Sequence, residues 1–105
     1  MEQVSLVHGF NVTESVRKSV ELIGGLRLIP DQSVVIKPNI CNSKNPEGMV
    51  ITDFDVIKGV VDLVRENGND LVLVESDNIS GSAVERMEKH LPLLTDRKEA
   101  LMILC

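Results

Sequence analysis

The feature that most constrains the fold is a short apolar run, residues 34–36, which ends directly in Lys37, Pro38 and Asn39. No polar residue lies between Ser33 and Lys37, which is typical of a strand buried on both faces of a parallel sheet. Proline fixes its backbone angle and lacks an amide hydrogen, so Pro38 ends the strand. The run therefore predicts a buried strand over residues 33–37, whose carboxyl end presents polar side chains.

Two other segments have the composition of strands. Residues 4–8 are short, contain mostly strand-forming residues and precede Gly9, whereas residues 71–74 are entirely apolar and precede Glu75. Residues 101–104 are also apolar, and their pattern fits either a strand or the end of a short helix. We therefore expect a sheet of three or four strands.

Helix start signals follow each of the first three strands. Asn11 with Glu14, and Ser82 with Glu85, have the spacing of a capping box, and Thr52 is a good amino-terminal cap. Behind these starts, apolar residues recur at helical spacing: Val12, Val16, Val20 and Ile23; Val56, Ile57, Val60, Val61 and Val64; and Val84, Met87 and Leu91.

Successive strand-helix units predict right-handed crossovers and an α/β fold. We expect a small three-layer domain with a mainly parallel sheet and helices on both faces, formed by residues 1–105 as a single domain. The chain has an apolar ending at residues 101–105. Either this ending packs back onto the sheet, a partner chain covers it, or the domain is the front part of a longer one.

Composition argues against several classes of partner and cofactor. The net charge of -5 disfavours nucleic acid, which needs a basic face. No apolar stretch approaches the ~20 residues of a membrane span, and the first residues do not resemble a signal peptide. Cys41 and Cys105 are too few for an iron–sulfur cluster or a four-cysteine zinc site. We expect a cytoplasmic protein with no nucleic-acid or membrane partner.

The candidate site lies where the strands end, because ligands bind beyond the carboxyl ends of open parallel sheets. Lys37 either supplies a cation for a phosphate or carboxylate or is a surface lysine that pairs with Glu75 or Asp77. We predict that the side chains of Lys37 and Glu75 come within salt-bridge distance. Asn39 either positions a ligand or forms a turn. Thr52 either caps its helix or contacts the ligand.

Acidic residues decide where an anion is expected. Asp53 and Asp55 occupy the positive end of the second helix and would repel a phosphate there. Glu75 and Asp77 with Asp53 could collect a divalent cation, but solvated acids or partners of Lys37 are the favoured interpretation, and we predict no metal site. The predicted ligand-binding residues are Lys37, Asn39, Thr52, Glu75, Ser76, Ser80, Gly81 and Ser82, with the last three forming a backbone nest.

No familiar catalytic motif is present. The segment after residues 4–8 lacks the three glycines of a dinucleotide fingerprint, and no Gly-Lys-Ser/Thr phosphate loop or Gly-X-Ser-X-Gly elbow occurs. The sequence therefore indicates no reaction.

A family resemblance rests on lysine, proline, asparagine and threonine at set intervals around two helices. Over residues 4–83 the chain resembles the family named domain of unknown function 362. The features that carry the resemblance are Ile36-Lys37-Pro38-Asn39-Ile40, Pro46-Glu47, Thr52 and the strand ending in Glu75-Ser76.

The resemblance implies an α/β domain whose matching site residues are Lys37, Asn39, Thr52, Glu75 and Ser76. It also implies an iron–sulfur association, because many members carry a separate ferredoxin-like segment. That segment is absent from this sequence and members are usually longer, so we expect no cluster in this chain and a truncated, front part of the family domain.

Two functional hypotheses follow. The first is a domain that binds a small anionic molecule at the carboxyl ends of its strands. The second is a non-catalytic interaction or assembly domain that forms a homo-oligomer or docks on a redox partner.

Overall fold

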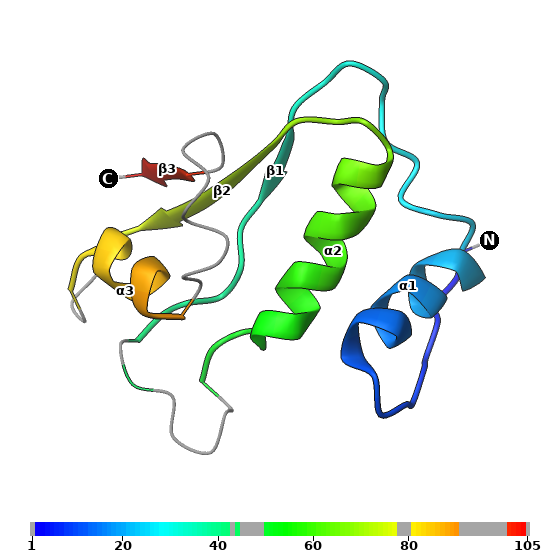
Figure 1. Ribbon diagram of the computed structural model, residues 1–105, viewed down its shortest axis with the longest axis horizontal. Coiled ribbons are helices and arrows are strands. Elements are labelled where there is room, and N and C mark those ends of the chain that lie inside the picture. The colour runs from blue at the N-terminus through cyan, green and yellow to red at the C-terminus, as the bar shows by residue number, and fades with distance from the viewer. Residues whose placement is uncertain (1, 43, 45–49, 78–80, 91–100, 105) are drawn as a thin grey trace.

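The computed structural model describes residues 2–42, 44, 50–77, 81–90 and 101–104 (Figure 1). In chain order its elements are α1 (Val12–Leu22), β1 (Val34–Ile36), α2 (Phe54–Glu66), β2 (Leu71–Ser76), α3 (Ala83–His90) and β3 (Leu101–Leu104).

The strands form a parallel sheet in the order β1-β2-β3. Val34 of β1 is in register with Leu71 of β2, and Leu73 of β2 with Leu101 of β3. Residues 101–104, for which the sequence left helix and strand open, thus form a strand. A mixed helix-and-strand chain with a small parallel sheet is confirmed, while helix layers on both faces stay a prediction.

Local signals explain where α1 begins and ends. The Asn11 side chain accepts a hydrogen bond from the Glu14 amide at 3.1 Å, which satisfies one of the unpaired amides of the first turn. At the other end, Gly24 and Gly25 have φ angles of +91° and +90°, a left-handed conformation that stops the helix at little steric cost. The predicted cap and stop of this helix are confirmed.

The cap of α2 is not the residue predicted. Asp53, rather than Thr52, is the amino-terminal cap, and its side chain accepts a hydrogen bond from the Asp55 amide at 2.8 Å. The Thr52 hydroxyl oxygen instead accepts a hydrogen bond from the backbone N–H of Asn39 at 3.1 Å. Thr52 therefore joins the loop after β1 to the start of α2.

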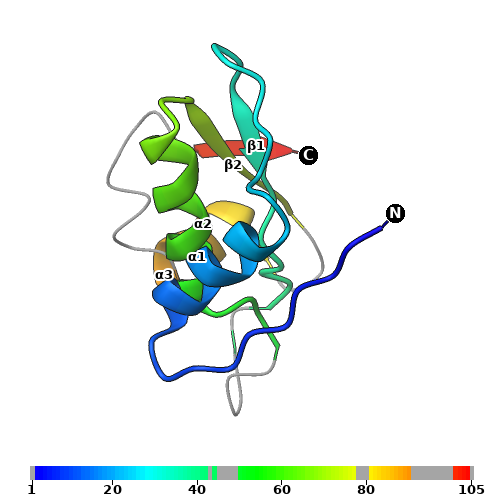
Figure 2. The same ribbon diagram turned by 90° about the vertical axis from the view of Figure 1, so that its right-hand side faces the viewer.

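The predicted strand at residues 4–8 is wrong. This segment is extended but forms no ladder with the sheet and runs outside α1, as Figure 2 shows in blue. The Ser5 hydroxyl donates a hydrogen bond to the Ser19 carbonyl of α1 at 2.7 Å, and the side chains of Val4 and Leu6 are each 95% exposed. Strand propensity alone did not place the segment in the sheet, because sheet pairing depends on long-range packing.

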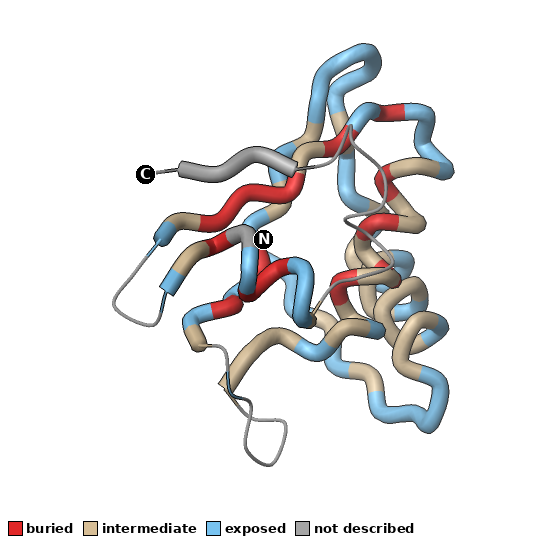
Figure 3. The backbone as a smooth tube through the Cα atoms, turned by 60° about the vertical axis from the view of Figure 1, so that its left-hand side comes forward, coloured by how far each residue is buried: buried red, intermediate tan, exposed pale blue. Residues whose placement is uncertain are grey.

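The core lies between α2, β2 and α3, where the buried residues gather (Figure 3). The α1 helix packs on the outer side of α2, where the absence of a side chain at Gly59 makes room for Val16. Arg17 and Glu66 join the two helices by paired hydrogen bonds of 2.7 and 2.6 Å. The buried cluster consists of Ile40, Ile57, Val61, Val64, Leu71, Leu73 and Met87.

Among the described residues, no helix is long and apolar enough to cross a membrane.

Candidate functional site

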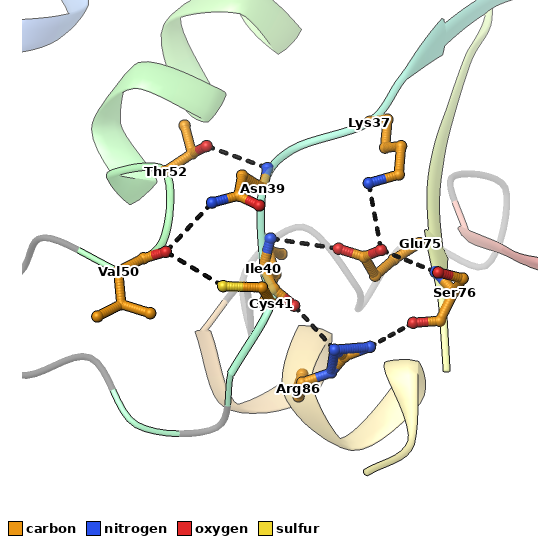
Figure 4. Close-up of polar contacts among 9 residues, drawn as sticks. All are labelled: Lys37, Asn39, Ile40, Cys41, Val50, Thr52, Glu75, Ser76 and Arg86. Atoms are coloured by element: carbon orange, nitrogen blue, oxygen red, sulfur yellow. Dashed lines mark hydrogen bonds and ion pairs between the residues drawn. The ribbon is translucent and has the colours of Figure 1, made fainter. Parts of the chain in front are cut away.

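The carboxyl ends of β1 and β2 bring a lysine and a glutamate together. Lys37 follows β1 directly, and Glu75 lies near the end of β2. The Lys37 Nζ lies 3.4 Å from the Glu75 Oε1, which confirms the predicted approach (Figure 4). The side chain of Lys37 is 55% exposed and that of Glu75 only 6%, so the ammonium remains open to solvent while the carboxylate does not.

Backbone amides hold the buried carboxylate of Glu75. Its Oε1 accepts a hydrogen bond from the Ser76 N–H at 2.8 Å, and its Oε2 accepts one from the Ile40 N–H at 3.2 Å. Burial by itself would raise the pKa of Glu75, but these two amides and the charge of Lys37 outweigh it, so the pKa lies below its ordinary value. Glu75 is therefore a carboxylate at neutral pH.

Sequence reasoning missed a second buried charge, Arg86 of α3, which is 1% exposed. Its Nη1 donates a hydrogen bond to the Ile40 carbonyl at 3.0 Å, and its Nη2 donates one to the Ser76 carbonyl. Its Nε has no hydrogen-bond partner among the residues that the structure describes. The guanidinium thus ties α3 to the segments that follow β1 and end β2, as Figure 4 shows.

A signal for Arg86 was present in the sequence. Ala83, Arg86, Met87 and His90 have the i, i+3, i+4, i+7 spacing of one helix face. Ala83 and Met87 are both fully buried, so this face points into the core. An arginine on such a face must find acceptors, because an unpaired buried charge is costly.

The loop after β1 is also fastened to the residues before α2. Besides the bond from its N–H to Thr52, Asn39 donates a side-chain hydrogen bond from Nδ2 to the Val50 carbonyl at 3.2 Å. The Cys41 Sγ lies 3.5 Å from the same carbonyl oxygen. Asn39 and Thr52 therefore hold the loop that follows Lys37, whatever else they contact.

The start of α3, where a backbone nest was expected, already holds an acid. The Asp77 Oδ1 accepts a hydrogen bond from the Ala83 N–H at 2.7 Å. An anion bound to the Ala83 amide would have to displace the carboxylate of Asp77. At the start of α2, an anion would likewise have to displace the carboxylate of Asp53. Gly81 has a φ of +117°, and Ser82 immediately precedes the helix.

The structure connects five of the eight predicted site residues through one set of contacts. Gly81 and Ser82 lie at the α3 start and Ser80 lies outside the described residues, as does the Pro46-Glu47 segment. The described residues contain no group of three or more His, Cys, Asp or Glu suited to a metal ion. The residues brought together are Lys37, Asn39, Thr52, Glu75 and Ser76.

The segment that contains Lys37, Glu75 and Arg86 matches a known protein family. Residues 34–92, more than half of the chain, match the family described as Domain of unknown function (DUF362). The chain belongs to the DUF362 family. This confirms the family suggested by the residues around Lys37, and the matched DUF362 segment contains β1, α2, β2 and α3. The description of DUF362 names no ligand or reaction, so an iron–sulfur association stays a prediction.

Neither a search of curated proteins nor a search of solved structures finds a match to the chain.

Proposed function

We propose that this DUF362 domain binds a small anionic ligand at the carboxyl ends of β1 and β2, with Lys37 as the contacting cation. The observation that carries the proposal is the charge balance of one hydrogen-bonded cluster. Among the described residues that these contacts join, Lys37 and Arg86 are cations and Glu75 is an anion. Lys37 lies beside Glu75, whereas Arg86 reaches the carbonyls of the two residues whose N–H groups bind Glu75. The cluster therefore has a surplus of positive charge in a protein whose net charge is -5.

The positions of the two cations divide their roles. Arg86 is buried and both of its terminal nitrogens donate to backbone carbonyls, so its donors are already used inside the protein. Lys37 is half exposed and reaches one oxygen of Glu75 at 3.4 Å. An ammonium has three donor hydrogens, so Lys37 can accept a second anion from solvent.

The arrangement favours a ligand with a single carboxylate or phosphate group. One accessible lysine is a point charge and does not provide the paired donors that arginine gives to a larger anionic surface. The fastened loop at Asn39 and Thr52 keeps the lysine backbone in place, which reduces the entropy lost on binding. The proposal is one of binding and assigns no reaction.

Native mass spectrometry of freshly purified protein tests the proposal. We expect the wild-type chain to retain an anionic adduct, or to take up added inorganic phosphate, and Lys37→Gln to lose it. Lys58→Gln is a matched control, because Lys58 is 45% exposed and pairs with Asp62 at 2.8 Å in α2. Equal uptake by the wild type and Lys37→Gln, or no uptake by the wild type, would contradict the proposal.

A further inference from the structure

The segment before α1 has the pattern of a strand without a sheet. Val4 and Leu6 are each 95% exposed, whereas Ser5 and Val7 between and after them are partly buried. Alternating exposure with a period of two is the geometry of a β-strand. In the part of the chain that the structure describes, no backbone-to-backbone hydrogen bond joins residues 2–10 to another element. The backbone of this segment is therefore available for pairing.

The segment is attached loosely where it lies. Its polar anchor is the hydrogen bond from the Ser5 hydroxyl to the Ser19 carbonyl at 2.7 Å. Beside this bond, the segment, α1 and α2 line a shallow hollow of about 390 Å³, with Val7, Val12 and Val56 among its lining residues. Since packing across a hollow is incomplete, little contact is lost when the segment moves away.

The same chain carries an edge that suits such a segment. Among the strands that the structure describes, the order β1-β2-β3 leaves the outer side of β1 without a partner. Val34 and Ile36 pack against the core, but Val35 between them is 64% exposed. An exposed apolar edge strand is a template for adding a strand from another chain.

The geometry favours a second copy over the segment's own sheet. The α1 helix packs on α2, and α2 packs on the sheet (Figure 1), so two layers of about 10 Å each separate α1 from β1. Residues 9–11 link the segment to α1 and span at most about 11 Å. The Arg17 and Glu66 pair keeps α1 on α2. The segment therefore cannot reach its own β1 while α1 stays in place.

We propose that residues 4–8 of one copy add as a strand to the free edge of β1 in a second copy. The second copy returns the same contact, which gives a closed two-fold dimer. The contact buries Val4, Leu6 and Val35, which are exposed in the single chain, and satisfies backbone groups on both strands.

The oligomeric state of the full chain tests the proposal, measured by analytical ultracentrifugation across a dilution series. We expect a dimer, and Leu6→Pro should raise its dissociation constant by roughly tenfold or more, because proline removes a ladder hydrogen bond and the substitution removes a buried leucine. Glu2→Pro, outside the segment, should leave the constant unchanged. Far-UV circular dichroism confirms that the helices are intact. A monomeric wild type, or a Leu6→Pro dimer as tight as the wild type, would overturn the proposal.

Disulfide trapping distinguishes a second copy from the same chain. With Cys41 and Cys105 replaced by serine, a Leu6→Cys preparation is mixed with an isotope-labelled Val35→Cys preparation under mild oxidation. We expect a disulfide-linked dimer that contains one labelled and one unlabelled chain. If the double variant Leu6→Cys/Val35→Cys instead closes its disulfide within one chain, the segment pairs with its own sheet and the proposal is wrong.

Discussion

Glu75 and Arg86 bind the same two residues, Ile40 and Ser76, through different backbone groups. Glu75 accepts hydrogen bonds from the two N–H groups, and Arg86 donates hydrogen bonds to the two carbonyls. Both charged side chains are almost excluded from solvent. Two buried side chains of opposite charge therefore join the end of β2 to the segment after β1 and to α3.

Glu75→Gln should lower the free energy of unfolding by about 1–3 kcal/mol, because an amide keeps one acceptor oxygen, so one of the two N–H groups that Glu75 binds loses its partner. Urea denaturation followed by circular dichroism measures the change. Glu66→Gln is the matched control: both oxygens of Glu66 also accept hydrogen bonds, from Arg17, but on the surface, so its effect should be much smaller. Equal losses in the two variants would show that burial of Glu75 adds nothing.

The same carboxylate should make stability depend on pH. Its folded-state pKa lies below the ordinary value of 4.5, so its contribution is present above that pH and is lost as the pH falls through the folded value. Urea midpoints should therefore fall on acidification, and the fall should be smaller in Glu75→Gln than in the wild type. A side-chain hydrogen bond from Arg17 also lowers the pKa of Glu66. The acid profile of Glu66→Gln is therefore measured as a comparison. Identical acid profiles for the wild type and Glu75→Gln would contradict the assignment.

Thr52 should stabilise the loop after β1 rather than the start of α2. Thr52→Val removes the acceptor of the Asn39 N–H and should cost about 1 kcal/mol, whereas Thr52→Ser keeps the hydroxyl and most of the stability. Amide hydrogen exchange should show the loss of protection at Asn39 in Thr52→Val only. Unchanged protection at Asn39 in that variant would mean that the hydroxyl has no such role.

Much of the fold could be predicted because it depends on local chemistry. Apolar runs predicted strands over residues 33–37 and 71–74, where β1 and β2 are found, and Asn11 and the glycines after residue 23 predicted the ends of α1. The approach of Lys37 to Glu75 followed from parallel strands sharing one edge. In each case the deciding interaction lies within a few residues or follows from strand direction alone.

The errors and omissions concern residues whose partners are distant in sequence. Residues 4–8 have strand propensity, but pairing depends on which edge they can reach. Thr52 is as good a cap as Asp53, and the choice depends on Asn39, 13 residues away. Arg86 is buried because carbonyls 46 and 10 residues away accept its hydrogens, and only the spacing with Ala83 and Met87 hinted at this.

Thermal unfolding with increasing inorganic phosphate, at constant ionic strength set with chloride, tests the central claim that Lys37 binds an anion. At a phosphate concentration about tenfold above the dissociation constant, binding should add about 1.4 kcal/mol to the stability of the wild type. Lys58→Gln should show the same gain, and it also reports any general effect of phosphate on the folded state. We predict that Lys37→Gln shows only that general effect. An equal phosphate-dependent gain in the wild type and Lys37→Gln would contradict the claim.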